Sequence, residues 1–141
     1  VPYGHYKKTP TVITKEQLNN ISELIQNVEF IHCSFVESLL NVKENDFVYL
    51  DPPYAPENAT SFVKYTTDGF CLDMHLKLFD MISEMNENNI KLTMSNSKTN
   101  IVLQHFESKE TFKIEELKAR RAINSKNPEA ITMELIITNI V

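Results

Sequence analysis

The sequence predicts an α/β domain whose sheet contains parallel strands. Short apolar runs rich in β-branched and aromatic residues are bounded by polar or proline-containing segments, which is typical of buried strands. Amphipathic helical stripes separate these runs, and strand, helix and strand in succession form a parallel βαβ unit. The chain has 141 residues, of which 42% are hydrophobic and 23% charged. That length and composition suffice for one domain with its own core.

The first predicted helix begins after Thr14. Residues 14–17, Thr-Lys-Glu-Gln, have the form of a capping box, in which the side chains at both ends satisfy free backbone amides. Apolar residues then recur at helical spacing, and we expect this stripe to lie in the core: Leu18, Ile21, Leu24 and Ile25.

A βαβ unit is predicted over the next segments. Val28–Cys33 and Asp46–Leu50 have the composition of strands, and residues 34–40 connect them as a short helix. Residues 55–69 are polar and show little helical periodicity, and a loop of this length is usually functional. We expect a flap over a ligand or a DNA strand, carrying Thr60, Ser61, Phe62, Tyr65 and Thr66.

The second half of the chain alternates between the two kinds of element. Helical spacing predicts a helix that ends near residues 88–89 and a short one over 101–106. Strands are predicted over 90–94, 112–117 and 131–139, with a basic loop over 118–128 before the last one. The helical stripe consists of Leu76, Phe79, Ile82 and Met85. Ser95, Asn96 and Ser97 follow the first of these strands, so we expect them at the same sheet edge as Asp51.

The tetrapeptide Asp51-Pro52-Pro53-Tyr54 is the main candidate site. It follows a predicted strand, and the two prolines end that strand because they lack backbone donors. In an open α/β sheet, ligands bind at the carboxyl ends of strands. A carboxylate and a carbonyl beside an aromatic ring suit a planar base that carries an amine, such as adenine or cytosine. The alternative is a rigid turn with a solvated Asp51 and a packed Tyr54. This alternative stays open, because a motif of four residues also occurs by chance.

The cysteines and the hydropathy of the sequence argue against a disulfide scaffold, a zinc site and a membrane span. Cys33 and Cys71 stand in apolar surroundings, and we expect buried free thiols and no disulfide scaffold. No spacing of cysteine and histidine resembles a zinc site, so no metal is expected. No apolar run approaches the length of a membrane span, and we expect a soluble cytoplasmic protein with no membrane partner.

For binding to nucleic acid, local clusters of basic residues matter more than the net charge of the chain, which is −5. The first ten residues combine the rings of Tyr3 and Tyr6 with lysines, which suits contacts to bases and phosphates. A surface tail fits them equally well. A second cluster is by itself more often a solvated surface than a nucleic-acid contact, and it comprises Lys118, Arg120, Arg121 and Lys126.

The chain contains few glycines, and this indicates that it is a piece of a larger protein. Gly4 and Gly69 are the two glycines, and neither follows a predicted strand and opens a helix, as a nucleotide-type cofactor loop requires. The chain also begins with Val1 rather than methionine. We therefore expect a piece of a larger protein.

Several segments together resemble one known family. The chain is similar over nearly its whole length to the C-terminal half of DNA adenine-N6 methyltransferases of the DNA adenine methylase type. The resemblance rests on Val-Pro-Tyr-Gly-His-Tyr-Lys-Lys at 1–8, Asp-Pro-Pro-Tyr-Ala-Pro at 51–56, Thr-x-Phe-x-x-Tyr within 60–65, Gly-Phe-Cys-Leu at 69–72, Ile-Lys-Leu-Thr-Met-Ser-Asn-Ser at 90–97 and Arg-Arg-Ala-Ile-Asn-Ser at 120–125.

The resemblance implies a partial Rossmann-like sheet of an S-adenosylmethionine-dependent methyltransferase. In such enzymes the target adenine is flipped out of the duplex. Asp51 and the Pro52 carbonyl would accept the N6 hydrogens, and Tyr54 would stack on the base. Asp51 would also lie near the methionine end of the cofactor, while Phe35 and Phe70 would line the adenosine pocket or pack in the core.

The resemblance also implies double-stranded DNA as partner. Residues 1–10 match the end of the target-recognition region, and residues 1–141 as a whole match the C-terminal part of the catalytic domain. His5 replaces a frequent arginine, and residues 32–35 depart from a more acidic pattern, which weakens cofactor contacts from that turn. The DNA contacts expected are Tyr3, Tyr6, Lys7, Arg120, Arg121, Asn124 and Ser125.

The cofactor loop and most of the recognition region would precede Val1, so we expect this chain to need that N-terminal part for activity. Two alternatives stay open at this point. One is methylation of another exocyclic amine, such as adenine in RNA. The other is a DNA-binding remnant without catalysis.

Overall fold

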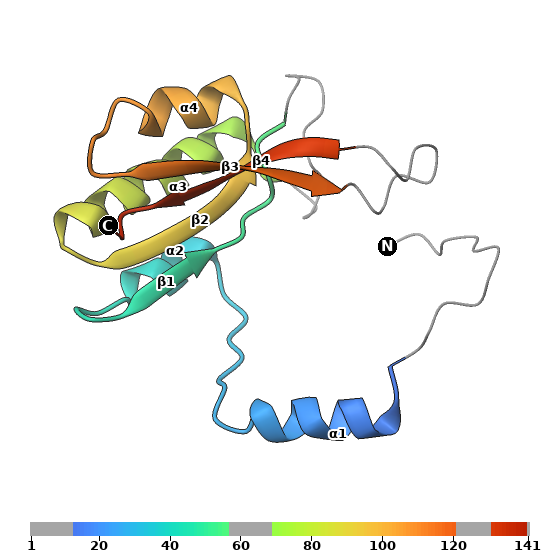
Figure 1. The fold of residues 1–141 in the computed structure, drawn as a ribbon. Helices are drawn as coiled ribbons and strands as arrows, with labels where there is room; N and C mark the ends of the chain where they lie inside the picture. The colour runs from blue at the N-terminus through green and yellow to red at the C-terminus, as the bar shows by residue number, and fades with distance from the viewer. Residues whose placement is uncertain (1–12, 57–68, 121–130, 141) are drawn as a thin grey trace. The chain divides into compact units, whose positions relative to one another are not determined.

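The computed structural model describes residues 13–56, 69–120 and 131–140. The chain divides into two compact units, residues 1–33 and 34–141. Within the described residues the elements follow in the order α1 (Lys15–Leu24), α2 (Phe35–Leu40), β1 (Phe47–Leu50), α3 (Leu72–Glu87), β2 (Lys91–Ser97), α4 (Asn100–Phe106), β3 (Lys113–Arg120) and β4 (Ile131–Thr138) (Figure 1).

The second unit is built on a four-stranded mixed sheet with the order β1-β2-β4-β3. β1 and β2 are parallel, with α3 in the connection between them, whereas β4 runs antiparallel to both of its neighbours. Leu50, the last residue of β1, lies opposite Met94 of β2. Because these two strands are parallel, Asp51 and the polar end of β2 emerge at the same edge of the sheet, as the sequence predicts.

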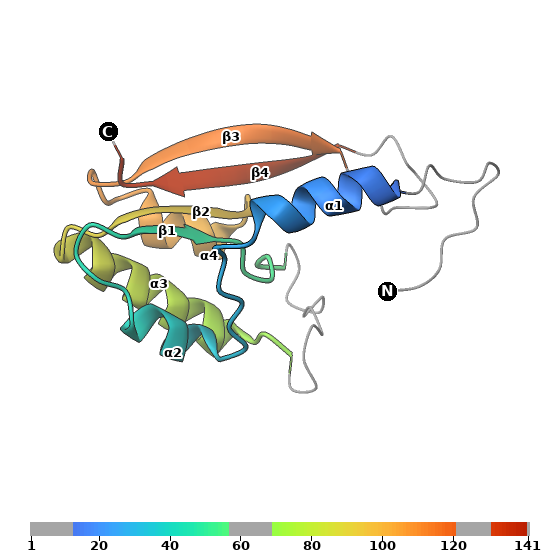
Figure 2. The ribbon, with the colours of Figure 1, turned by 90° about the horizontal axis from the view of Figure 1, so that it is seen from below.

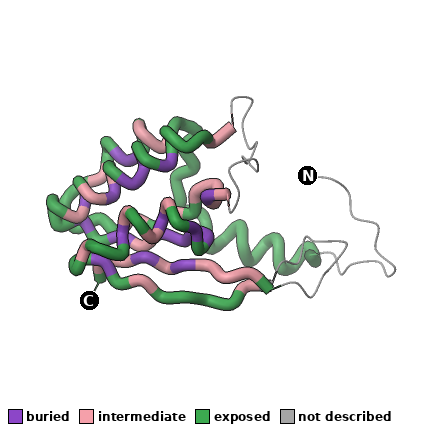
Figure 3. The backbone as a smooth tube through the Cα atoms, turned by 90° about the horizontal axis from the view of Figure 1, so that it is seen from above, coloured by how far each residue is buried: buried purple, intermediate pink, exposed green. Residues whose placement is uncertain are grey.

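One face of this sheet carries the hydrophobic core. Leu92 and Met94 of β2 and Leu135 and Ile137 of β4 are fully buried on that face, and all three helices of the unit contribute side chains to the same cluster. Figure 2 shows these three helices on one side of the sheet. Figure 3 shows the buried positions concentrated along β2, β4 and the helices that adjoin them. The helical contributions are Leu39 from α2, Leu78, Phe79, Ile82 and Met85 from α3, and Val102 and Phe106 from α4.

The opposite face and the β1 edge are more open. Phe47 and Tyr49 alternate with core-facing Val48 and Leu50, and they remain 57% and 61% exposed. The prediction of a strand at 46–50 is therefore confirmed, but the expectation that it is buried is wrong for this half of its side chains. Among the described residues, only β2 pairs with β1.

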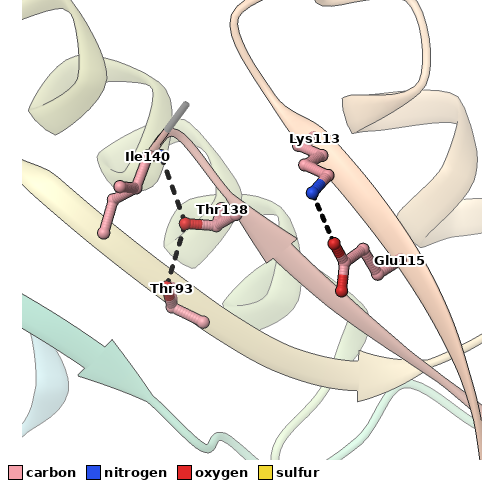
Figure 4. Close-up of polar contacts among 5 residues, drawn as sticks. All are labelled: Thr93, Lys113, Glu115, Thr138 and Ile140. Atoms are coloured by element: carbon pink, nitrogen blue, oxygen red, sulfur yellow. Dashed lines mark hydrogen bonds and ion pairs between the residues drawn. The ribbon is translucent and has the colours of Figure 1, made fainter.

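A hydroxyl network fixes the register of the central strands. The Thr138 hydroxyl on β4 accepts hydrogen bonds from the Thr93 hydroxyl on β2 (2.9 Å) and from the Ile140 amide (3.2 Å), and it donates to the Leu92 carbonyl (2.8 Å) (Figure 4). On the neighbouring β3, Lys113 forms an ion pair with Glu115 at 2.6 Å. This register determines which β4 side chain lies opposite the polar end of β2.

The helices α2, α3 and α4 and the strands β2, β3 and β4 confirm the predicted elements within a few residues. α3 begins at Leu72, earlier than its periodic residues indicate, and its buried stripe includes His75 and Leu78, whereas Leu76 is exposed. β3 extends to Arg120, so Lys118 and Arg120 belong to a strand and not to the predicted loop. The predicted flap residues 60–66 lie outside the described part of the chain.

Two predictions in the first unit are wrong. The capping box forms, with Thr14 and Gln17 bonding each other's backbone amides, but α1 buries none of its residues and its apolar stripe is exposed. An amphipathic stripe becomes core only where another surface covers it. Residues 28–33 form no strand, since no described strand pairs with them, and the first predicted βαβ unit is therefore absent.

The expectation of buried thiols is also wrong. Cys33 and Cys71 are both exposed and free. Cys33 belongs to the unpaired 28–33 segment, and Cys71 is the N-cap residue of α3, where the chain is only partly covered. Along the described residues, no helix has both the length and the apolar character that crossing a membrane requires.

Candidate active site

Asp51 stands at the carboxyl end of β1 and is held there by the next strand. The Ser95 hydroxyl of β2 donates a hydrogen bond to Asp51 Oδ1 at 2.9 Å. Ser95 is buried, whereas Asp51 is exposed, so one carboxylate oxygen is fixed by the protein while the residue stays open to a ligand. A hydrogen bond to a carboxylate is stronger than one between neutral groups, which makes this contact an effective orienting device.

The turn after Asp51 is fixed to β2 by a second pair of contacts. The Ala55 amide donates to Asn96 Oδ1 at 2.9 Å, and the Ser97 hydroxyl donates to the Ala55 carbonyl. Ala55, Asn96 and Ser97 are all buried. Pro52 and Pro53 restrict the backbone between these anchors, because each ring fixes its own φ angle. The tetrapeptide is therefore held at both of its ends, and the prediction that the polar end of β2 faces Asp51 is confirmed.

Tyr54 reaches across to β4. Its hydroxyl donates a hydrogen bond to Glu134 Oε2 at 3.3 Å. Burial is the largest cause that raises the pKa of Tyr54 above its ordinary value; the Ser95 hydroxyl opposes it, and the nearby Glu134 and Asp51 carboxylates raise the pKa as well. The phenol therefore stays neutral at physiological pH. Glu134 was not predicted from the sequence, although an acidic residue within an otherwise apolar strand is a detectable signal.

Phe35 and Phe70 come together from separate parts of the chain. Their ring centroids lie 5.6 Å apart with a tilt of 55°, and both side chains are half-buried. Phe35 begins α2, where Ser34 and Glu37 form a capping box, and Phe70 precedes α3. A pair of partly exposed rings has the shape and polarity on which an adenine can pack. The structure thus brings the two predicted pocket residues together.

His75 extends this aromatic group into the core. It is 1% exposed, and its ring meets Phe70 edge-on at 4.7 Å between centroids. Neither ring nitrogen has a hydrogen-bond partner among the described residues. Burial lowers the pKa of His75 below its ordinary value, so its imidazole is neutral near pH 7. The sequence analysis assigned it no role.

Of the predicted DNA contacts, the structure describes the backbone position of Arg120 alone. Arg120 is the last residue of β3, opposite Ile131 at the start of β4, so it lies at the end of a hairpin. The other predicted contacts fall outside the described residues: Tyr3, Tyr6, Lys7, Arg121, Asn124 and Ser125. Within the described part of the chain, no group of three or more His, Cys, Asp or Glu side chains could hold a metal ion.

The sequence of the whole chain was compared with known families. The model of the D12 class N6 adenine-specific DNA methyltransferases matches residues 1–123. The chain belongs to this family. The predicted family is thereby confirmed, and the mixed α/β sheet is consistent with part of a Rossmann-like methyltransferase fold.

Individual curated proteins are similar to the chain over most of its length. A type II methyltransferase of Lactococcus lactis subsp. cremoris is 32% identical over 142 residues, covering 99% of this chain and 49% of that protein. A type II methyltransferase of Methanocaldococcus jannaschii is 36% identical over 144 residues, covering 99% and 48%. The DNA adenine methylase of Escherichia coli is 32% identical over 126 residues, covering 89% and 44%. The chain thus spans about half the length of the curated relatives it matches.

Proposed function

We propose that residues 1–141 are the C-terminal part of the catalytic domain of a site-specific DNA methyltransferase, which methylates N6 of an adenine flipped out of double-stranded DNA. The observation that supports this most strongly is the separate anchoring of Asp51 and Tyr54. Asp51 is held by Ser95 of β2 and Tyr54 by Glu134 of β4, at the carboxyl edge of a parallel strand pair. A base placed between such fixed groups is oriented before it reacts.

In this proposal Asp51, Pro52 and Tyr54 hold the adenine, and Pro53 restricts the backbone between them. Asp51 and the Pro52 carbonyl accept the two hydrogens of the adenine amine, and Tyr54 stacks on the base. Holding both hydrogens directs the nitrogen lone pair out of the base plane toward the methyl donor. S-adenosylmethionine would supply the methyl group, and Asp51 and the Pro52 carbonyl would hold N6 in place to receive it. No covalent bond to the protein is required, so positioning is the main contribution.

S-adenosylmethionine is the proposed cofactor and supplies the methyl group. The paired rings of Phe35 and Phe70 fit its adenine, because they form an apolar, partly open surface. Asp51, which follows the last residue of β1, would contribute to holding the same cofactor. The described residues contribute no glycine-rich turn of the kind that carries a nucleotide cofactor at a helix N-terminus, so we assign them only part of the pocket.

The remaining part of the pocket belongs, in this proposal, to the N-terminal half that the longer relatives possess. The two edges of the sheet differ in a way that supports this. β3 carries Lys113, Glu115, Glu116 and Lys118, and such charges protect an edge from pairing. β1 presents exposed Phe47 and Tyr49 and has no such protection. We therefore assign the β1 edge to a further strand from the N-terminal half.

The first ten residues are proposed as the end of the target-recognition region. Tyr3, Tyr6 and Lys7 would contact DNA there. Arg120, Arg121, Asn124 and Ser125 would contact the DNA backbone from the end of the β3–β4 hairpin, a position that Arg120 supports by ending β3.

The direct test identifies the product. The complete methyltransferase that contains this chain is incubated with duplex DNA and S-adenosylmethionine carrying an isotopic label in its methyl group, and the nucleosides are analysed by mass spectrometry. The proposal predicts label in N6-methyladenine. Label confined to cytosine, to RNA supplied in parallel, or to no nucleoside at all would refute it. An Asp51→Ala variant should yield no labelled N6-methyladenine. Asp80→Ala is its matched control, since Asp80 is exposed on α3.

A further inference from the structure

Glu134 is a half-buried carboxylate that lies on the same face of the sheet as the candidate site. It is opposite Ser97 of β2 in the strand register, and Ser97 holds the turn that follows Tyr54. All its neighbours in β4 from Leu135 to Ile137 are apolar. A carboxylate in such a strand loses part of its hydration, which is costly unless the group has a partner. Among the described residues, the Tyr54 hydroxyl provides a partner for this carboxylate, at 3.3 Å.

The Tyr54 side chain is consequently restrained at both ends. Its backbone end is set by Pro53 and by the Ala55 contacts to Asn96 and Ser97. Its hydroxyl end is set by Glu134. A tyrosine side chain has two torsions, and fixing the far end of the ring limits both of them. Without Glu134, the ring would keep its attachment but lose the contact that selects one orientation.

We propose that Glu134 is a positioning residue, which holds the Tyr54 ring in the orientation that stacks on the target base. This inference rests on the proposed function, because it deepens the role of Tyr54 in that site. Glu134 acts through Tyr54 and contacts no reacting atom. Asp51 and Tyr54 are thereby oriented by separate strands, Asp51 through Ser95 of β2 and Tyr54 through Glu134 of β4.

The first test concerns the contact itself and needs no methylation. The ionisation of Tyr54 is followed by ultraviolet absorbance in the 141-residue chain, and the titration of a Tyr54→Phe variant is subtracted to remove the other tyrosines. The Glu134 carboxylate raises the pKa of Tyr54, so Glu134→Gln is expected to lower it. Circular dichroism over the same range verifies that the fold persists. An unchanged Tyr54 titration in Glu134→Gln would overturn the proposal.

The second test is a double-mutant cycle in the complete methyltransferase. Glu134→Ala is expected to lower kcat by about tenfold, the effect of losing one hydrogen bond to a charged group, with a smaller change in KM for DNA. Glu134→Gln keeps an acceptor and is expected to retain most of kcat. In a Tyr54→Phe background, Glu134→Ala should have little further effect.

Equal losses from Glu134→Ala in the two backgrounds would contradict the proposal, because a purely structural role of Glu134 does not depend on the Tyr54 hydroxyl. Glu115→Gln is the matched control, since Glu115 lies on the same sheet face but pairs with Lys113. Absence of methylation by the unaltered protein would refute the proposed function instead, and the tyrosine titration would then decide whether Glu134 holds Tyr54.

Discussion

The hydroxyl of Ser95 donates a hydrogen bond to Asp51 Oδ1 at 2.9 Å, which joins the ends of the two parallel strands β1 and β2 at one point. Ser95 is buried and Asp51 is exposed. The contact therefore orients a carboxylate without removing it from the solvent-facing side. Its second oxygen stays available to a ligand, which is the arrangement that binding of an amine requires.

Removing this hydroxyl should impair catalysis more than folding. We expect Ser95→Ala to lower kcat of the complete methyltransferase by about tenfold, because one hydrogen bond to a charged group is lost and Asp51 gains rotational freedom. Stability should change by no more than about 1 kcal/mol, since Asp51 remains hydrated. Steady-state kinetics and urea unfolding measure the two effects. A control is Ser38→Ala, in an exposed position on α2. Unchanged kcat in Ser95→Ala would show that Asp51 needs no support from β2.

The stability of the chain should fall in mild acid because of the buried His75 and the half-buried His105. Burial lowers the pKa of His75 from its ordinary value of 6.5, and burial followed by the nearby Lys109 lowers that of His105. A histidine with a depressed pKa in the fold contributes stability that is present above pH 6.5 and is lost as the pH falls through the folded-state value. The free energy of unfolding should therefore decrease between about pH 7.5 and about pH 5.5.

A histidine variant separates the contribution of His75 from that of His105. In His75→Leu the decrease over this range should be smaller than in the unaltered chain, because the buried imidazole is gone and only that of the half-buried His105 remains. The exposed His32 offers the matched control variant, His32→Leu. Urea unfolding at several pH values gives the measurement. A His75→Leu chain with the full pH dependence would show that His75 is not desolvated in solution.

The basic hairpin end is expected to contact DNA phosphates without regard to sequence. Replacing Arg120 and Arg121 by alanine should flatten the log-log salt dependence of DNA binding by about 0.9 per lost phosphate contact. Preference for the cognate sequence should persist, because phosphate contacts position the protein while base contacts specify the site. Affinities for a cognate and a scrambled duplex at several salt concentrations provide the test. A slope equal to that of the unaltered protein would remove this hairpin from the interface.

Local sequence signals predicted much of the fold and the centre of the site. The capping box at Thr14 acts within one turn of helix, and it forms. The Asp51 tetrapeptide and the polar end of β2 were assigned to one sheet edge, because parallel strands must end together.

Features that depend on distant partners were not predictable in this way. The 28–33 segment has strand composition, yet a strand requires a neighbour to pair with, and no described strand provides it. The stripe on α1 has the same dependence on a covering surface. Glu134 acquires its role only through the β2–β4 register, which brings it within reach of a tyrosine 80 residues away in sequence.

The central claim is that Asp51 orients the adenine amine and leaves duplex binding to other residues. The most direct measurement compares Asp51→Ala with the unaltered complete methyltransferase, following methyl transfer to adenine N6 and affinity for duplex DNA in parallel. We predict that transfer is abolished while affinity changes little, since phosphate contacts by distant cations dominate it. Transfer by Asp51→Ala at a rate near that of the unaltered enzyme would contradict the account.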